Sequence, residues 1–443
     1  MVIAINEQSI LFTKRRFLPY FCTQALGAFN DNIFKNVLLL LVAFAAPGTL
    51  FLDSNLIINL AAGLFILPFF LFSASAGLLA DKYEKSWLIR RIKLAEVAIM
   101  LLAGGALFTE SYSVLLLLLF LMGTQSAFFG PVKYALLPQH LNDNELVPGN
   151  ALVEAGTFLA ILSGTLLAGL IADQPNAHYI AAVAVIVFSM LGYLISRAIP
   201  EAPASDPGIR FAWRPIKHTG QAIQLVKENK TVYSCILAIS WFWFLGASYL
   251  TQFAQYTKLY LGGNASAVSV LLALFSVGIA LGSLLCDRLS GHRIEPGIVP
   301  LGSLGLTVFG ADLLFSTPSS VLVYTDIIGF ICNPALMRVY VDLLMIGISG
   351  GLFIVPLYAM MQKRAKREQL ARTIAVNNII NAIFMVVSAI AGMILLGLAG
   401  VSIPLFFFIL AVINAFVALY IFHQVPEFMQ CFTSWITGNR ASS

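Results

Sequence analysis

Residues 29–36 read Phe-Asn-Asp-Asn-Ile-Phe-Lys-Asn and lie inside the first long apolar run of the chain. Ionised side chains are costly in mid-bilayer, where they usually face a protein interior or a wet cavity and mark a pathway. Asp31 and Lys35 are four residues apart, so on a helix they share one face. We interpret Asn30, Asp31 and Lys35 as one wall of a polar site that binds a charged group. The alternative is an internal ion pair that only makes the helix insertable.

The composition indicates a polytopic membrane protein. Hydrophobic residues make up 59% of the 443 residues and charged residues only 11%, whereas soluble domains are about a quarter charged. The five cysteines are scattered without metal-like spacing, so we expect no metal and no cofactor. No catalytic motif such as HExxH or a Walker loop is present, and we therefore expect no enzyme.

Apolar runs of about 20 residues, enough to cross a bilayer as a helix, occur in two groups of six. The first group covers 17–46, 55–80, 88–109, 112–137, 147–172 and 178–199. The second covers 231–261, 265–287, 296–316, 338–362, 372–397 and 401–424. We expect an all-α protein of about 12 transmembrane helices. Its predicted parts are an N-terminal bundle (1–199), a cytoplasmic linker (200–230), a C-terminal bundle (231–424) and a cytoplasmic tail (425–443).

The basic residues predict the orientation of these spans. When both termini and the even-numbered loops are placed in the cytoplasm, 23 of the 26 lysines and arginines lie on that side, and the exceptions are Lys35, Lys258 and Arg338. This asymmetry is the positive-inside pattern, so the net charge of +5 reports topology and not nucleic-acid binding. The first span is too long for a signal peptide and should be retained. Residues 317–337 are predicted to be an outer loop with an interfacial segment.

The two groups of spans echo each other. Gly77 and Asp81 close the second span, and Gly282 with Asp287-Arg288 closes the eighth. A glycine here permits close approach of a neighbouring helix, and the acid can face a helix N-terminus or a basic partner. We expect these residues to form a conformational latch.

A second echo relates the fourth and fifth spans to the tenth and eleventh. Pro131, Asn150 and Glu154 are matched by Pro356, Asn377 and Asn381 at nearly constant offsets. Two six-helix halves related in this way are the parallel repeat of a major facilitator transporter, in which substrate binds between the halves near mid-membrane.

Sequence motifs narrow the family. Residues 77–85 resemble the signature loop of the major facilitator superfamily, although Glu84 replaces the usual second glycine. The stretches 29–35, 129–138, 150–154 and 355–362 look like those of the bacterial lysophospholipid transporters. Members of that family occur alone or as the N-terminal part of fusions with acyltransferase and acyl-carrier-protein synthetase domains. They move lysophospholipids to the inner leaflet for reacylation.

This resemblance implies a flippase in the bacterial inner membrane that takes lysophosphatidylethanolamine or lysophosphatidylglycerol. We expect lateral entry, because drawing the acyl chain through water would cost about 0.8 kcal/mol per methylene. Asp31 and Lys35 would compensate the charges of the headgroup, and Lys133 is the next candidate unless it snorkels to the interface. Glu154 could line the cavity, take up a proton or pair with Lys133. The chain ends at Ser443 without an enzyme domain, so a separate acyltransferase or acyl-carrier-protein synthetase is expected to act downstream of a monomer.

Two other functions stay open at this point. A proton-coupled transporter of a small solute or drug on the same fold would require Asp31 or Glu154 to titrate. A membrane scaffold without transport is disfavoured, because buried charges are costly to retain without a use.

Overall fold

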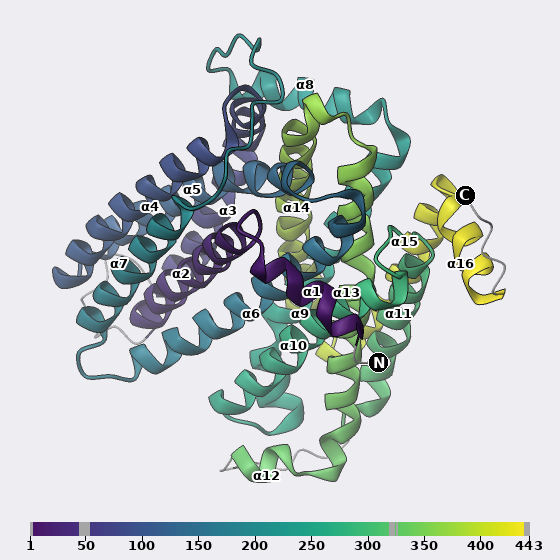
Figure 1. Cartoon of the computed structure of the whole chain (residues 1–443). Coiled ribbons are helices and arrows are strands. Elements are labelled where there is room, and N and C mark those ends of the chain that lie inside the picture. The colour runs from purple at the N-terminus through teal and green to yellow at the C-terminus, as the bar shows by residue number, and fades with distance from the viewer. Residues whose placement is uncertain (1–2, 44–53, 319–323, 325–326, 438–443) are drawn as a thin grey trace. The chain divides into compact units, whose positions relative to one another are not determined.

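The computed structural model of the protein describes residues 3–43, 54–318, 324 and 327–437. Every regular element within these residues is a helix (Figure 1). The long helices of the first half of the sequence are α2 (Leu18–Ala43), α3 (Ser54–Lys82), α4 (Lys85–Phe108), α5 (Tyr112–His140), α6 (Leu146–Ala172) and α7 (Ala177–Ser196). Those of the second half are α9 (Lys230–Tyr256), α10 (Ala265–Ser290), α11 (Ile298–Ser316), α13 (Met337–Arg364), α14 (Leu370–Gly392) and α15 (Ile403–Gln424).

Each predicted span therefore corresponds to one long helix. Among the described residues, 11 helices are long and apolar enough to cross a membrane. The exception is α4, whose first half carries Arg90, Arg91, Lys93 and Glu96. Its charges lower its hydropathy, although its length of 24 residues is sufficient for a span.

The shorter elements lie between and beyond these helices. They are α1 (Ile3–Thr13), α8 (Pro215–Lys227), α12 (Ile327–Ile331) and α16 (Glu427–Thr437). The predicted linker at 200–230 is thus irregular as far as Arg214 and helical from Pro215 to Lys227. The predicted outer loop at 317–337 lies partly outside the described residues, and its interfacial placement stays a prediction.

Contacts divide the chain into two compact units, which are described separately. Unit 1 comprises Met1–Asn142, Ala160–Glu228 and Ala365–Ala382. Unit 2 comprises Asp143–Leu159, Asn229–Arg364 and Ile383–Ser443. Each unit thus includes a segment from the other half of the sequence, the start of α14 in unit 1 and the start of α6 in unit 2. The domain boundaries inferred from the order of spans stay a prediction.

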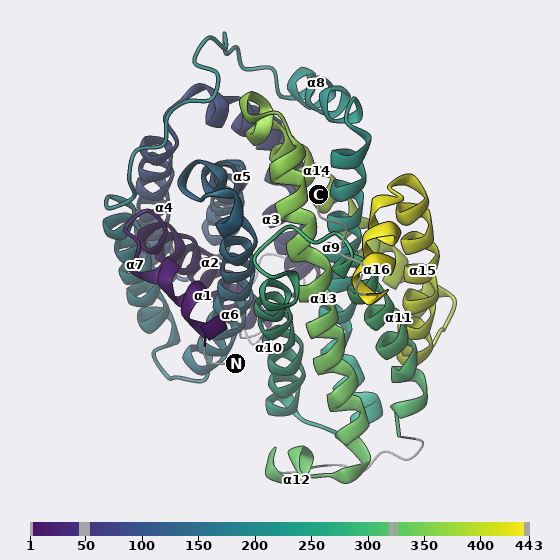
Figure 2. The ribbon, with the colours of Figure 1, turned by 45° about the vertical axis from the view of Figure 1, so that its right-hand side comes forward.

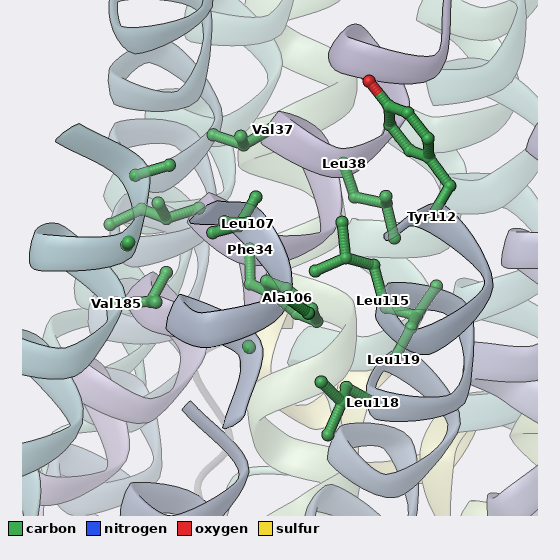
Figure 3. Packing of buried hydrophobic residues seen from close by; sticks show 14 of the residues in the cluster. Phe34, Val37, Leu38, Ala106, Leu107, Tyr112, Leu115, Leu118, Leu119 and Val185 are labelled. Atoms are coloured by element: carbon green, nitrogen blue, oxygen red, sulfur yellow. The ribbon is translucent and has the colours of Figure 1, made fainter. Parts of the chain in front are cut away.

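The core of unit 1 is a close-packed helical layer. Helix α7 packs against both α4 and α2, and α3 packs against α5 (Figure 2). Phe34 and Leu38 of α2 meet Leu107 of α4 and Leu115 of α5 in one buried cluster (Figure 3). Because lipid tails are as apolar as these side chains, van der Waals packing rather than expulsion from water stabilises such contacts.

In unit 2, α10 and α13 are joined through interlocking glycines. A Cβ on Gly278 would lie 2.5 Å from the carbonyl oxygen of Leu344, and one on Gly282 would overlap the carbonyl oxygen of Ile348. Gly347 and Gly351 of α13 meet the backbone of α10 in the same way. Both helices thus present a Gly-x-x-x-Gly pair, the pattern that lets two backbones approach closely in membranes.

This seam yields a stability prediction. Gly282→Ala places a methyl group against a rigid backbone oxygen, so it should destabilise the protein by about 1–3 kcal/mol, as overpacking does. The midpoint of thermal unfolding in detergent should fall accordingly. Gly246→Ala in α9 is the matched control, because a Cβ there meets nothing within 4 Å, and it should leave the midpoint unchanged or raise it. Equal midpoints for both variants would contradict the interlock.

Candidate functional site

A buried ion pair within α4 forms the centre of a polar network in unit 1. Lys93 Nζ lies 2.6 Å from Glu96 Oε2, and both side chains are at most 1% exposed. The ring of Phe129 on α5 lies 5.1 Å from the ammonium. Gly27 of α2 leaves room for it, since a Cβ there would be 2.5 Å from Nζ.

Neutral amides complete the coordination of Glu96. Gln125 of α5 donates its Nε2 hydrogen to Oε2 over 3.0 Å, and Asn30 of α2 donates its Nδ2 hydrogen to Oε1 over 3.4 Å. A buried charge is tolerated when it is paired and its remaining lone pairs are hydrogen-bonded. Both carboxylate oxygens of Glu96 meet this condition.

Asp31 joins the same network through Ser126 of α5. The Ser126 hydroxyl lies 2.7 Å from Asp31 Oδ2 and 3.2 Å from Gln125 Oε1. The other oxygen, Asp31 Oδ1, is buried and accepts no hydrogen bond from the described part of the chain. An unpartnered carboxylate oxygen is the strongest open acceptor that the network presents.

The side chain of Lys35 contacts groups other than Asp31, although the spacing of the two residues suggests that the two could pair. It donates to Asn32 Oδ1 over 3.1 Å and lies 5.5 Å from the ring centre of Phe65 on α3. Within the described residues no ion pair joins Lys35 to Asp31. The two charges are therefore separate groups on one helix, which weakens the interpretation of a closed structural pair.

Lys133 and Glu154, the other predicted binding residues, belong to different units. Lys133 on α5 is buried, with its ammonium 4.9 Å from the ring of Tyr134. Glu154 on α6 is completely buried. Their predicted pairing stays a prediction.

The predicted latch residue Asp81 faces the first turn of α14 within unit 1. Arg372 Nε donates to Asp81 Oδ2 over 2.8 Å, and the backbone N–H of Ala371 donates to Oδ1 over 3.2 Å. The acid thus meets both a helix N-terminus and a basic partner, the two favourable environments for a carboxylate. Gly77 allows this approach, because a Cβ there would lie 2.8 Å from Ala375 Cβ and 2.9 Å from the Ala371 carbonyl oxygen.

A cavity of about 380 Å³ adjoins this contact on the side of α8. Leu78 and Arg372 line it together with residues of α8, among them Gln221 and Leu225. Arg372 is consequently 17% exposed while Asp81 is completely buried. The cavity gives a soluble reagent a route to the edge of the latch.

Glu84 explains how the signature loop works without its second glycine. The residue has φ −59°, a value at which no glycine is required. Its carboxylate caps α4 by accepting from the backbone N–H groups of Ser86 and Trp87, and it also accepts from Ala202 N over 2.7 Å. Burial opposes ionisation, but these backbone donors hold the pKa of Glu84 below its ordinary value.

The corresponding latch residues of the second half are arranged differently. Asp287 is completely buried, and His292 Nδ1 lies 3.0 Å from its Oδ1. Arg288 is exposed and forms no side-chain hydrogen bond with the described residues. The predicted role of Arg288 thus has no contact in the structure to support it.

The two echoed asparagines also differ. In unit 2, Asn150 of α6 and Gln362 of α13 exchange reciprocal amide hydrogen bonds of 2.7 and 3.2 Å. In unit 1, the buried side chain of Asn377 on α14 makes no hydrogen bond with the described residues, and neither does the Nδ2 group of Asn378. Asn378 Nδ2 lies directly over Gly130 of α5. An open donor from the second half of the sequence is thus one helical turn along α5 from Ser126, which holds Asp31.

Sequence comparison places the chain in a family. A family model described as Major Facilitator Superfamily matches residues 20–345. The chain belongs to the Major Facilitator Superfamily. Its fold class is therefore the one predicted from the sequence, and it is a multi-pass transporter rather than an enzyme.

Curated relatives within this superfamily carry the name that the motifs suggested. A protein of Klebsiella pneumoniae named lysophospholipid transporter LplT is 27% identical over 383 residues, covering 85% of this chain and 87% of its own length. A protein of the same name from Serratia proteamaculans is 28% identical over 374 residues, covering 83% of this chain and 85% of its own length. The predicted resemblance to this transporter family is confirmed.

Solved structures support the superfamily fold. The transporter FucP in its outward conformation superposes with a TM-score of 0.69 at 12% identity, covering 93% of this chain and 99% of its own. The human organic anion transporter MFSD10 gives 0.66 at 14% identity, covering 91% of this chain and 98% of its own. At such identities the likeness concerns the fold alone.

The ion pair in α4 was not singled out from the sequence. Lys93 and Glu96 lie inside the predicted span 88–109, and neither is among the residues predicted for the site. The available signal was Glu96, an acid inside an apolar run three residues after a lysine, which places the two on one helix face. Its partners on α2 and α5 could be known only from the structure.

The ion pair predicts a compensation between two variants of this transporter. Lys93→Met leaves Glu96 buried and unpaired, so it should cost about 3–5 kcal/mol and sharply reduce the yield of folded protein. Lys93→Met combined with Glu96→Gln removes both charges and should recover most of that yield. Size-exclusion chromatography of the membrane extract is the measurement. A double variant as poorly folded as Lys93→Met would contradict mutual compensation.

The latch of this transporter predicts a change in accessibility. Asp81→Asn removes the charge that faces α14, while Asp206→Asn, the matched control, removes only a 3.5 Å contact to Arg372. We expect a cysteine introduced at residue 78, beside the cavity, to react about tenfold or more faster with a soluble maleimide in Asp81→Asn, as loss of a charge-assisted hydrogen bond predicts. Unchanged reactivity would show that Asp81, in the last turn of α3, does not act as a latch.

Proposed function

We propose that this transporter moves lysophospholipids, such as lysophosphatidylethanolamine and lysophosphatidylglycerol, to the inner leaflet of a bacterial inner membrane. The observation that carries the proposal is the open pair of polar groups beside α5 in unit 1. Among the described residues, Asp31 Oδ1 is a buried acceptor without a hydrogen-bond partner, and Asn378 Nδ2 is a buried donor without one. Leaving a buried polar group without a hydrogen-bond partner is costly. Such groups are expected in a binding site, where the ligand supplies the missing hydrogen bonds.

The chemistry of the two headgroups suits these groups. An ethanolamine headgroup offers an ammonium and a glycerol headgroup offers hydroxyls, so both supply a donor to Asp31. The phosphate common to both is an acceptor for the Asn378 amide and for Lys35, whose partners in the structure are a neutral amide and a ring. In this assignment Lys93 and Glu96 touch no ligand and hold Asp31, Gln125 and Asn30 in place.

The acyl chain of the lysolipid determines how the substrate enters the protein. A lysolipid already has its tail among other tails, and exposing that tail to water costs about 0.8 kcal/mol per methylene. Lateral entry between helices lets the tail stay in apolar surroundings while the headgroup alone crosses a polar site. In this proposal the protein works by alternating access as a monomer, with both termini in the cytoplasm. Its product passes to an acyltransferase or acyl-carrier-protein synthetase.

The alternative is a proton-coupled transporter of a small solute or drug. One observation favours it, namely that the network contains two carboxylates, Asp31 and Glu96, beside the single ammonium of Lys93. Proton coupling would make transport follow an imposed pH gradient, and a water-filled route would not admit an acyl chain.

Reconstituted protein tests the proposal. Proteoliposomes would be loaded with labelled lysophosphatidylethanolamine, and its transfer between leaflets followed with and without a proton gradient. We expect Asp31→Asn to abolish transfer and Asn378→Ala to slow it by about tenfold or more, the cost of one hydrogen bond to a charged group. Exposed Asp173→Asn and Asn176→Ala are the matched controls and should transfer at the wild-type rate.

Two results would overturn this assignment. Wild-type transfer by Asp31→Asn would remove the headgroup from this part of unit 1. Absence of lysolipid transfer by the wild-type protein, together with gradient-driven uptake of a water-soluble solute, would establish the alternative function.

A further inference from the structure

The segment before and at the start of α8 exposes apolar and basic side chains together. Ile216 is 91% exposed and Trp213 is 54% exposed. The side chains of Arg210, Arg214 and Lys217 are also exposed, and these side chains form no hydrogen bond or ion pair with the described residues. A nearly fully exposed isoleucine between unpaired cations is unfavourable in water and typical of a peripheral membrane anchor.

The opposite face of α8 fixes this segment to a transmembrane helix. His218, Ala222 and Val226 are buried, at the spacing of one helix face. His218 Nδ1 lies 3.0 Å from Ser75 Oγ of α3. Burial lowers the pKa of His218, so the neutral ring is a structural contact and the positive charge of the segment comes from its three exposed cations.

Aromatic contacts place the segment beside the apolar part of α3. The rings of Trp213 and Phe72 are 5.9 Å apart, and Phe211 lies 6.0 Å from Trp213. Phe72 is ten residues before Lys82, the last residue of α3, so Trp213 packs against the side of this long helix and not against its end.

We propose that residues 210–217 are a membrane-surface anchor that binds anionic phospholipids. Trp213 and Ile216 enter the boundary between headgroups and acyl chains, the position preferred by indole rings. Arg210, Arg214 and Lys217 take the phosphate groups of the surrounding acidic lipids. The occupant is lipid rather than a soluble protein, because the exposed side chains adjoin a helix flank that is itself in the membrane. This surface is independent of the transported substrate.

The experiment uses the full-length protein in lipid nanodiscs. Ile216→Cys would be made in a Cys22→Ser, Cys332→Ser and Cys431→Ser background, which leaves only the buried Cys235 and Cys286, and labelled with a nitroxide. Its accessibility to oxygen and to a water-soluble nickel chelate reports depth. In bilayers containing phosphatidylglycerol we expect high oxygen and low nickel accessibility.

A second measurement tests the charge. Spin-labelled phosphatidylglycerol should be enriched at the protein over phosphatidylcholine, and Arg214→Glu with Lys217→Glu should reduce this enrichment about tenfold or more, since each cation at an acidic surface contributes about a fivefold preference. Lys366→Glu with Arg367→Glu, a matched pair of exposed cations, should leave it unchanged.

Three outcomes would overturn the inference. A label at residue 216 that is open to nickel in anionic bilayers would place the segment in water. Equal enrichment of both lipids would remove the charge recognition. Spin–spin broadening between labels would assign the surface to a second copy of the chain. None of these results bears on lysolipid transfer, which is measured separately.

Discussion

The buried pair of Lys93 and Glu96 is the constraint on which the rest of unit 1 depends. A carboxylate in an apolar helix layer requires a counter-charge and donors for both oxygens. The counter-charge comes from its own helix, and the donors come from α2 and α5, so three helices share one fixed register. Gly27 and Phe129 then shape the space around the ammonium. The open oxygen of Asp31 has a defined position only because this framework holds its neighbours.

Much of the architecture was predictable because the local composition of a segment largely determines whether it can span a membrane. Twelve runs of apolar residues became twelve long helices, and the glycine and acid at the end of the second span became a close contact with α14. Hydropathy predicts the twelve helices, and the position of the motif predicts the close contact at the end of the second span. The partner of Asp81, however, is Arg372, nearly 300 residues later, and no local pattern specifies such a pairing.

The site was predictable only in part, for an identifiable reason. Asp31 stood out because a charge in an apolar run is conspicuous. Lys93 and Glu96 are also charges inside a predicted span, 88–109, but they are not among the residues predicted for the site. The direct pairing suggested by the spacing of Asp31 and Lys35 is absent among the described residues. Asp31 instead accepts a hydrogen bond from Ser126, and Lys35 donates one to Asn32. Competition from neutral polar side chains, one on α5 and one on α2 itself, cannot be inferred from i, i+4 spacing.

The glycine interlock between α10 and α13 has a mechanical meaning. Each notch is filled by a backbone atom of the other helix, and a backbone atom cannot rotate aside as a side chain can. Sliding or rolling one helix against the other would drive carbonyl oxygens into Cα atoms. The two helices should therefore move together as one rigid body. Rearrangement during the transport cycle must then occur at seams lined by side chains, where rotamers can absorb the motion, and the glycine seam serves as a stiff frame for them.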